Sequence, residues 1–308
     1  MIEHFSNSAF DSFFSACQHK YELNYLQRLS APKGLSLVTG SAVDDAVSWA
    51  YQERVDHRPL PPVSAIVGRM KHEYFSALLE GLNLEGVSEE VLLAFSNQAA
   101  EDPMAAFKAF WESSPERFTG VRFSAKDDPM ENFRIVNAAL EIYADEHMPA
   151  INPKYVQRTL LVEIPGVSKP MKMVLDLFTQ ESSLIDLKTS SSRKPDDWVK
   201  KSTQLSTYQW GMERLGEPVK SLGYHILVKT KKPGVQIQKG PARSKTEIDD
   251  FERVLAMRAN VILNQRVFPP CPWDALSNPC SWCDFGPAGL CKFRPPEVKD
   301  NREDAIED

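Results

Sequence analysis

The stretch MKMVLDLFTQESSLIDLKTS, Met171–Ser190, decides the fold. It contains two short apolar runs, Met171–Phe178 and Ser183–Thr189, separated by a turn-like segment. Runs of this length bounded by turn residues predict two β-strands joined as a hairpin. In such a hairpin we expect Asp176 on the first strand to come close to Asp186 on the second.

The second strand carries an Asp-x-Lys pattern whose chemistry depends on side-chain alternation. Asp186 and Lys188 share one face of the strand, while Ile185 and Leu187 take the other. Two carboxylates beside an ammonium on apolar strands are costly to bury unless a cation compensates them. Magnesium or manganese, which prefer oxygen ligands, would supply that compensation. The alternative is that Asp186 and Lys188 form an exposed strand pair worth about 0.2–1 kcal/mol.

Lys188 has several roles open to it beside such a cation. It could orient or deprotonate an attacking water, or stabilise the charge that develops on a phosphate. Around this hairpin we expect three more strands and several helices. The strands are Tyr155–Ile164, Val219–Lys229 and Val235–Lys239, and the helices are Ser8–Leu26, one from about Gly40, Pro195–Leu215 and Lys245–Asn264.

Length and composition are those of an ordinary globular protein. The chain has 308 residues, of which 42% are hydrophobic and 25% charged, which excludes collagen-like and wholly disordered proteins. The longest apolar run, Val91–Phe95, is far shorter than the roughly 18 residues of a membrane span. The first residues show neither a basic segment nor a long apolar segment, so we expect no secretory signal and a cytoplasmic protein.

Charge is unevenly distributed along the chain. The net charge is −6, yet the segment from Lys188 to Lys245 holds thirteen Lys and Arg against four acids, a local charge of +9. A basic segment inside an acidic protein fits a groove that neutralises phosphates. Because no base-reading module is recognised, we expect nucleic-acid binding without sequence specificity.

Two residues on the helix after the hairpin complete a pattern. Gln204 and Tyr208 lie four residues apart, so they share one helical face, and an amide with a phenol suits contacts to a phosphate or a base. In their order and separation, Asp176, Asp186 and Lys188 with these two residues resemble the PD-(D/E)XK nuclease superfamily, specifically its RecB-like exonuclease branch.

The resemblance implies a fold and an activity. The fold would be α/β, a restriction-endonuclease-like core with a mixed central sheet flanked by helices, together with a large helical insertion and a C-terminal iron–sulfur segment. The activity would be metal-dependent hydrolysis of phosphodiester bonds in single-stranded DNA or at DNA ends, in recombination, repair or replication.

The resemblance also implies roles for individual residues. Asp44 stands four residues after Gly40, where the family usually has a histidine ligand, and this difference leaves the metal preference open. Glu163 is a further candidate, or else a solvated strand carboxylate. The implied sets are catalytic Asp176, Asp186 and Lys188; Mg²⁺ or Mn²⁺ ligands Asp44, Asp176, Asp186 and Leu187; and DNA contacts Gln204, Tyr208, Lys229, Lys231 and Lys232.

Four of the five cysteines, Cys271, Cys280, Cys283 and Cys291, lie within the last forty residues. Cys280, Cys283 and Cys291 form a C-x2-C-x7-C pattern, and Cys17 lies near the other end of the chain. In a reducing compartment such clustering indicates metal binding, and four thiolates also suit zinc. The arrangement resembles AddB-type and CRISPR-associated exonucleases, which implies a [4Fe–4S] cluster on Cys17, Cys280, Cys283 and Cys291. Cys271 has no place in that pattern and is expected to be a plain thiol.

We therefore expect five segments along the chain. They are an N-terminal helix with the first cluster cysteine (1–39), a helical region (40–154), the nuclease core (155–265), an iron–sulfur segment (266–296) and an acidic tail (297–308). A second functional hypothesis is a catalytically weak iron–sulfur DNA-binding subunit that supports a helicase or recombinase. Asp44 in place of histidine favours this alternative, whereas the intact Asp176, Asp186 and Lys188 favour the enzyme.

Overall fold

The computed structural model describes residues 2–124, 127–271, 279–286 and 288–293. The chain divides into two compact units, one formed by Met1–Ala31 with Arg258–Asp308 and the other by Pro32–Met257. The five segments expected from the sequence stay a prediction, and the acidic tail at 297–308 lies outside the described residues.

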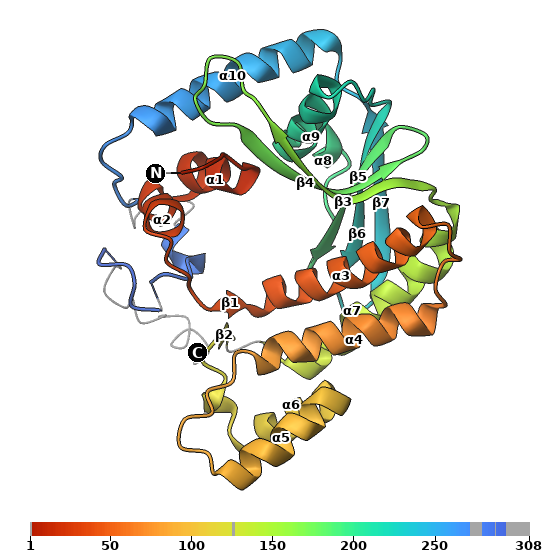
Figure 1. Cartoon of the computed structure of the whole chain (residues 1–308), viewed down its shortest axis with the longest axis vertical. Coiled ribbons are helices and arrows are strands. Elements are labelled where there is room, and N and C mark those ends of the chain that lie inside the picture. The colour runs from red at the N-terminus through yellow and green to blue at the C-terminus, as the bar shows by residue number, and fades with distance from the viewer. Residues whose placement is uncertain (1, 125–126, 272–278, 287, 294–308) are drawn as a thin grey trace, which may run out of the picture. The chain divides into compact units, whose positions relative to one another are not determined.

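The larger unit is built on a mixed five-stranded sheet with the order β3-β4-β5-β6-β7. Its strands are β3 Pro153–Val162, β4 Met171–Thr179, β5 Ser183–Ser190, β6 Ser221–Val228 and β7 Gly234–Pro241. β5 and β6 are parallel, and the other neighbours are antiparallel. Helices α8 and α9 lie between β5 and β6 in the chain, as a parallel connection requires (Figure 1). The expected α/β fold with a mixed sheet flanked by helices is confirmed.

The helices of this unit pack on the sheet and on one another, with α3 against α4 and β3, α5 against α6, and α8 and α9 against the strands. They are α3 Leu35–Val55, α4 Val63–Leu79, α5 Glu89–Glu101, α6 Pro103–Ser113, α7 Pro129–Ile142, α8 Trp198–Lys201, α9 Thr203–Arg214 and α10 Lys245–Asn264, the last of which continues into the smaller unit. The short helical turns are η3 Pro115–Arg117, η4 Tyr143–His147 and η5 Met148–Ala150. Helix α3 was expected to begin near Gly40 but begins at Leu35. Pro32 and Gly34 lie directly before its first turn, and Gly34 is its extended N-cap residue.

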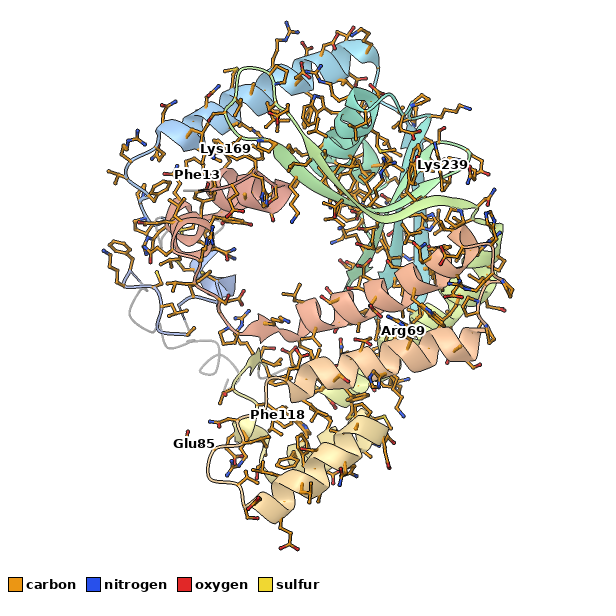
Figure 2. All side chains as sticks on the ribbon, viewed as in Figure 1. Phe13, Arg69, Glu85, Phe118, Lys169 and Lys239 are labelled. Carbon is orange, nitrogen blue, oxygen red and sulfur yellow. The ribbon has the colours of Figure 1, made fainter. Side chains whose placement is uncertain are left out.

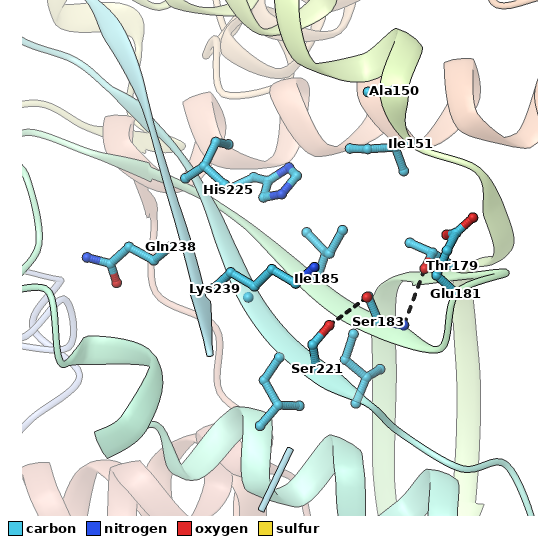
Figure 3. A pocket seen from close by; sticks show the side chains of 14 residues that line it. Ala150, Ile151, Thr179, Glu181, Ser183, Ile185, Ser221, His225, Gln238 and Lys239 are labelled. Carbon is cyan, nitrogen blue, oxygen red and sulfur yellow. Dashed lines mark hydrogen bonds between the residues drawn. The ribbon is translucent and has the colours of Figure 1, made fainter. Parts of the chain in front are cut away.

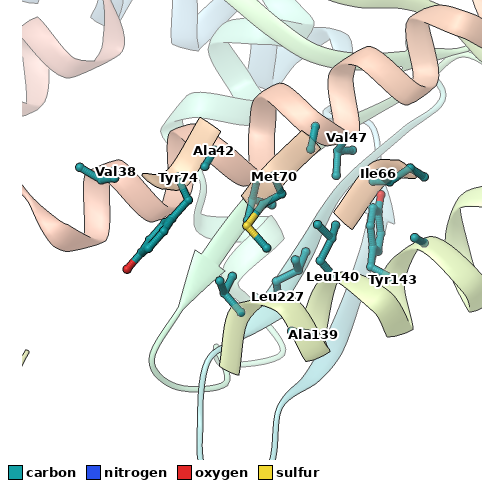
Figure 4. Packing of buried hydrophobic residues seen from close by; sticks show 14 of the residues in the cluster. Val38, Ala42, Val47, Ile66, Met70, Tyr74, Ala139, Leu140, Tyr143 and Leu227 are labelled. Atoms are coloured by element: carbon teal, nitrogen blue, oxygen red, sulfur yellow. The ribbon is translucent and has the colours of Figure 1, made fainter. Parts of the chain in front are cut away.

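The main hydrophobic core lies between these helices and one face of the sheet. α3 buries residues three and four apart, among them Val43, Val47 and Ala50, which is the stripe of an amphipathic helix. Side chains of α4 and α7, such as Met70 and Leu140, meet this stripe over the sheet residue Leu227 (Figure 4). The described residues between 40 and 154 thus form one wall of the core, although α5 and the short turn η3 have no buried residue.

Polar side chains fix where several helices begin. Asp102 and Asp128 accept hydrogen bonds from the first main-chain amides of α6 and α7, each followed by a proline in the first turn. Ser202 caps α9 through the amide of Leu205 at 3.0 Å. That cap separates α8 from α9, so the helix expected over Pro195–Leu215 is two helices.

Helices α3 and α4 are also joined on their outer surface. The guanidinium of Arg69 on α4 donates to Asp45 on α3 at 2.6 Å and lies 5.3 Å from the ring of Trp49 (Figure 2). Strand β1, Lys33–Gly34, precedes α3, and strand β2, Val121–Arg122, follows α6. The two pair as a two-stranded sheet. Neither short strand was expected, since two residues carry no periodic signal.

The smaller unit contains a helical segment that Cys17 interrupts. It consists of α1 Asn7–Asp11, η1 Ser12–Ala16, α2 Gln18–Tyr21 and η2 Glu22–Leu26, while Cys17 is extended at φ −151° and ψ 123°. The single helix expected over Ser8–Leu26 is therefore wrong at one residue. Phe13 and Tyr21 pack on Phe268 at ring distances of 6.2 and 5.9 Å. The last helical element among the described residues of this unit is the turn η6, Pro279–Trp282.

None of the helices in the described ranges has the length and apolarity needed to cross a membrane.

Candidate active site

The hairpin of β4 and β5 holds the two predicted carboxylates. The strands pair at Phe178 opposite Leu184 and at Leu177 opposite Ile185, and the next step in this register corresponds to Asp176 and Asp186. At that point Asp176 Oδ2 accepts a hydrogen bond of 2.9 Å from the main-chain N–H of Leu187. The carboxylate of Asp176 therefore acts as a hydrogen-bond acceptor for β5 at the point where the backbone pairing of β4 and β5 ends.

Asp186 and Lys188 form a buried ion pair. The ammonium of Lys188 lies 2.7 Å from Asp186 Oδ2, and the side chain of Asp186 is 0% exposed. Apart from this ion pair, the carboxylate oxygens of Asp186 accept no hydrogen bond from any described residue. A buried carboxylate with free lone pairs is the kind of group that a cation satisfies.

A third carboxylate comes from α3. Burial and the nearby charge of Asp176 raise the pKa of Asp44 to about 7. Burial and the same neighbour raise the pKa of Asp186 to about 7, and burial raises the pKa of Asp176 as well. Three acids in one place repel one another, so their charges favour a bound cation or a proton.

The donor set fits a hard divalent cation in its chemistry, although it is not a closed cage. Among the residues that the structure describes, no three His, Cys, Asp or Glu side chains converge as a ready-made metal site. Carboxylate oxygens of Asp44, Asp176 and Asp186 are the ligands that magnesium and manganese prefer. Leu187 can add only its main-chain carbonyl oxygen, because its side chain has no donor atom and its amide N–H cannot bind a cation.

Lys188 remains an ammonium in this environment. Burial opposes its charge, but Asp186 and Asp176 outweigh burial and raise its pKa above the usual value. Lys188 also lines a cavity of about 320 Å³ together with Asp44 and Asp176. The rest of the lining comes from Ser36, Leu37, Gly40, Ser41, Val43, Leu187 and Thr189. A cavity whose wall carries two carboxylates and one ammonium suits a cation together with a small polar group.

The predicted pair on α9 lies beside this cluster. Gln204 Nε2 donates to the hydroxyl of Tyr208 at 2.7 Å. Burial, with the charges of Asp186 and Asp176, raises the pKa of Tyr208, which stays a neutral phenol. Tyr224, which pairs with Asp186 across β5 and β6, has its pKa raised by burial and then by Asp186, and no sequence signal had singled it out.

The predicted lysines fall into two groups. Lys229 is partly buried, its pKa is lowered by burial, and its ammonium lies 3.5 Å from Asn132 Oδ1. Lys231 and Lys232 are exposed in the turn between β6 and β7. Glu163 follows β3 and is exposed. Asp176 lines two cavities, and Glu163 lines neither of them. Its reading as a solvated strand carboxylate is therefore favoured.

One family model matches the chain, that of the PD-(D/E)XK nuclease superfamily, over residues 4–288. The chain belongs to this superfamily. Nucleases of this superfamily hydrolyse nucleic acids and typically use a divalent metal, in agreement with the carboxylates on β4 and β5.

Comparisons with individual proteins give less. No curated protein matches the chain. A crystal structure of a "Putative exonuclease" from Eubacterium rectale is 16% identical, with a TM-score of 0.47, and the match covers 99% of this chain and 94% of that chain. A crystal structure of SSO0001 is 15% identical, with a TM-score of 0.30, covering 77% and 98% of the two chains.

In the smaller unit of the chain, all five cysteines line one small pocket. The main-chain N–H of Cys271 donates to Cys17 Sγ at 3.3 Å, and Cys271 Sγ lies 3.4 Å from Cys280 Sγ. Cys283 and Cys291 complete the lining. The spacing of the cysteines in the sequence did not place Cys271 with the others, because only the fold brings it beside Cys17.

A second cavity of the larger unit, about 370 Å³, is lined by Glu181 among other residues (Figure 3), but by none of the three aspartates of the candidate site. Ser183 and Ser221 share a hydrogen bond of 2.6 Å at its wall, and His225 and Lys239 also line it. His225 Nδ1 lies 2.8 Å from the hydroxyl of Tyr143. Asp44, Asp176, Asp186 and Lys188 are absent from its wall, so we place the candidate active site in the cavity that Asp44, Asp176 and Lys188 line, where Lys188 is paired with Asp186.

Proposed function

We propose that the chain is a metal-dependent deoxyribonuclease that hydrolyses phosphodiester bonds of single-stranded DNA or of DNA ends. The observation that carries this proposal is the buried carboxylate of Asp186, which is held 2.7 Å from Lys188 and lies beside the carboxylate of Asp176. Such a cluster has little value as a structural element, because replacing buried ion pairs by apolar residues is often neutral or stabilising.

Asp176 and Asp186, with Asp44 and the carbonyl of Leu187, would hold Mg²⁺ or Mn²⁺. The cation would neutralise charge on the scissile phosphate and lower the pKa of the attacking water. Because the pKa of Lys188 is raised, this residue serves as a fixed positive charge beside the phosphate rather than as a general base. Gln204 and Tyr208 supply neutral donors for the DNA backbone.

The hydrolysis has a simple balance. The oxygen of water bonds to phosphorus while one P–O bond of the DNA backbone breaks. One proton of the water ends on the departing hydroxyl, and the other belongs to the new phosphate monoester, which ionises in solution. Lys188 stabilises the additional negative charge that accumulates on the phosphate oxygens during this exchange.

The test is cleavage of end-labelled single-stranded and duplex DNA with Mg²⁺ or Mn²⁺. We expect Lys188→Ala and Asp186→Asn to lower the rate at least a hundredfold, while Lys172→Ala, an exposed lysine on the strand of Asp176, retains the rate. Wild-type protein that cleaves neither substrate with either metal, or variants that keep full activity, would refute the proposal.

The DNA path is proposed to follow the basic segment beyond β5. Lys231 and Lys232 in the β6–β7 turn are exposed and free to reach a phosphate backbone, with Lys229 closer to the core. Contacts of this kind bind any sequence and weaken with salt. A linear fall of log affinity with log salt concentration, shallower in a Lys231→Ala, Lys232→Ala double variant, is the expected result.

We also propose that Cys17, Cys280, Cys283 and Cys291 bind a [4Fe–4S] cluster, as the resemblance implies. The gathering of these thiols in one pocket supports a metal centre, and the reducing cytoplasm expected for this chain would keep them as thiols. Iron and acid-labile sulfide in protein purified without oxygen, with broad visible absorbance, are the expected findings. Zinc at one ion per chain would instead support the alternative.

The second candidate function is a catalytically weak DNA-binding subunit that supports a helicase or recombinase. The observation that favours it is Asp44, an acid where the family usually has histidine. Wild-type protein that binds DNA and Mn²⁺ but does not cleave would support this candidate. Restoring a nitrogen donor with Asp44→His should then raise cleavage above the wild-type level.

A further inference from the structure

Asp44 is held by a glutamine from the edge strand β3. Gln157 Nε2 lies 2.9 Å from Asp44 Oδ1 and 3.0 Å from Asp44 Oδ2, and 3.1 Å from the hydroxyl oxygen of Ser48. Ser48 is one helical turn after Asp44, so both acceptors are on the same face of α3. One neutral amide therefore contacts both oxygens of the carboxylate.

The backbone at Gln157 is strained to make this contact. Its φ is 46°, in the left-handed region, although it belongs to a β-strand. The β3–β4 pairs recorded around it are Val156 with Leu177 and Arg158 with Leu175, so Gln157 sits at the step of the ladder that corresponds to Asp176. A residue other than glycine in the left-handed conformation costs about 1–2 kcal/mol, and such strain concentrates at functional sites.

The residues around Gln157 are anchored, which lets the strain persist. The hydroxyl of Tyr155 donates to Glu217 Oε1 at 2.6 Å. The guanidinium of Arg158 lies 3.9 Å from the ring centroid of Tyr155. Since the chain is fixed on both sides, the conformation of Gln157 is determined by its surroundings rather than by local preference.

Asp44 keeps binding capacity after this contact. An ionised carboxylate offers about four lone-pair sites, and the amide of Gln157, whose two N–H groups are shared among Asp44 Oδ1, Asp44 Oδ2 and Ser48, occupies at most two of them. The amide brings no charge, so it restricts the carboxylate without competing for the role of the cation. Hydrogen bonds of this kind orient metal-binding carboxylates in many metal sites.

We propose that Gln157 is a positioning residue that fixes the carboxylate of Asp44 for the cation held by Asp176 and Asp186. This inference rests on the proposed metal-dependent function. It predicts that metal affinity depends on the amide of Gln157, and that relief of the strained backbone alone does not preserve it.

Two variants separate the hydrogen bond from the strain. Gln157→Asn keeps an amide and suits a left-handed conformation better, but its side chain is shorter by one methylene, about 1.5 Å. Gln157→Leu removes the donor and keeps the approximate size. Mn²⁺ affinity is measured by titration calorimetry at constant pH, and thermal stability is measured without divalent metal.

We expect both variants to bind Mn²⁺ about 10–100-fold more weakly than wild type. Gln157→Asn should nevertheless melt at the wild-type temperature or above it. A merely structural role would move the melting temperature and leave the affinity unchanged. Asp176→Asn is the reference variant that loses a direct ligand.

The outcomes distinguish this inference from the proposed function. If both variants bind Mn²⁺ within twofold of wild type while Asp176→Asn does not, the role of Gln157 is refuted and the metal site stands. If wild type and Asp176→Asn are alike in failing to bind Mn²⁺, the proposed metal-dependent function fails, and the inference fails with it.

Discussion

The ammonium of Lys188 lies 2.7 Å from Asp186 Oδ2, in a pair whose carboxylate has no exposed side-chain surface. The partners are two residues apart on β5, so one strand presents both charges on one face. Each charge depends on the other for its burial, and this dependence leads to measurable consequences.

Lys188→Met should destabilise the metal-free protein more at pH 8 than at pH 5. At pH 8 Asp186, with a pKa of about 7, is mostly ionised and loses its ion-pair partner Lys188, a loss worth about 3 kcal/mol. At pH 5 the carboxyl is protonated and the loss is smaller. Urea unfolding at the two pH values measures the difference, with Lys172→Met as the surface control. An equal loss at both pH values would contradict this account.

The raised pKa values of Asp44 and Asp186, both about 7, predict how pH acts on stability and metal affinity. Because the folded state binds these protons more tightly than the unfolded chain, the stabilisation is complete below pH of about 4 and is lost as pH rises through about 7. Wild type should therefore lose stability relative to Asp186→Asn between these values. Mn²⁺ affinity should rise from pH 6 to pH 8, with proton release on binding. A pH-independent affinity would argue against buried carboxylate ligands.

Trp198 is expected to contribute to binding of single-stranded DNA. Its ring stacks on Tyr224 at 4.2 Å, its side chain is partly exposed, and the ammonium of Lys194 lies 5.3 Å from the ring centroid. Trp198→Ala should weaken binding by about 1–3 kcal/mol, while Trp198→Phe retains most of the affinity. Fluorescence anisotropy with a labelled oligonucleotide measures the effect.

Trp210 provides the matched control for that measurement. Its ring is 1% exposed and its indole N–H donates to Glu252 at 2.7 Å, so it belongs to the core. Trp210→Phe should lower the melting temperature and leave DNA affinity unchanged. The reverse pattern, with Trp210 sensitive for DNA and Trp198 silent, would place the stacking surface elsewhere.

Gly120→Ala should destabilise the larger unit, because a Cβ at Gly120 would lie 2.6 Å from the Cα of Gly81. The two glycines are joined by a hydrogen bond of 2.8 Å from Gly120 N–H to the carbonyl of Gly81, so neither backbone can retreat easily. We expect a loss of about 1–3 kcal/mol. At Gly211 the added Cβ would meet the flexible end of Met173, so Gly211→Ala should cost less. Thermal unfolding compares the two variants.

The hairpin of β4 and β5 was predictable because it is a local feature. Its two apolar runs and its turn residues lie within twenty consecutive positions, and the predicted strands match those observed to within about a residue. α10 was predicted at its observed bounds for the same reason. Where one residue overrides the pattern, as Cys17 and Ser202 do, the sequence predicts a continuous helix and the structure has an interruption.

The contacts between distant segments could not be predicted from the residues alone. Gln157 and Asp44 are 113 positions apart, and nothing in the sequence around Gln157 marks a left-handed residue or a partner for a carboxylate. Tyr224 reached the candidate site through the parallel register of β5 and β6. Cys271 approached Cys17 across a separation of 254 positions.

The bond from the N–H of Leu187 to Asp176 has a consequence for how this site could decay. Because the carboxylate of Asp176 also accepts the N–H of Leu187 from the neighbouring strand, a lineage that lost nuclease activity would still be under pressure to keep an acceptor at position 176. Retention of Asp176 in a descendant is thus poor evidence of an active enzyme. Lys188 is the more sensitive indicator of activity. If its ammonium is lost, its partner Asp186 can take up a proton and become a neutral acid.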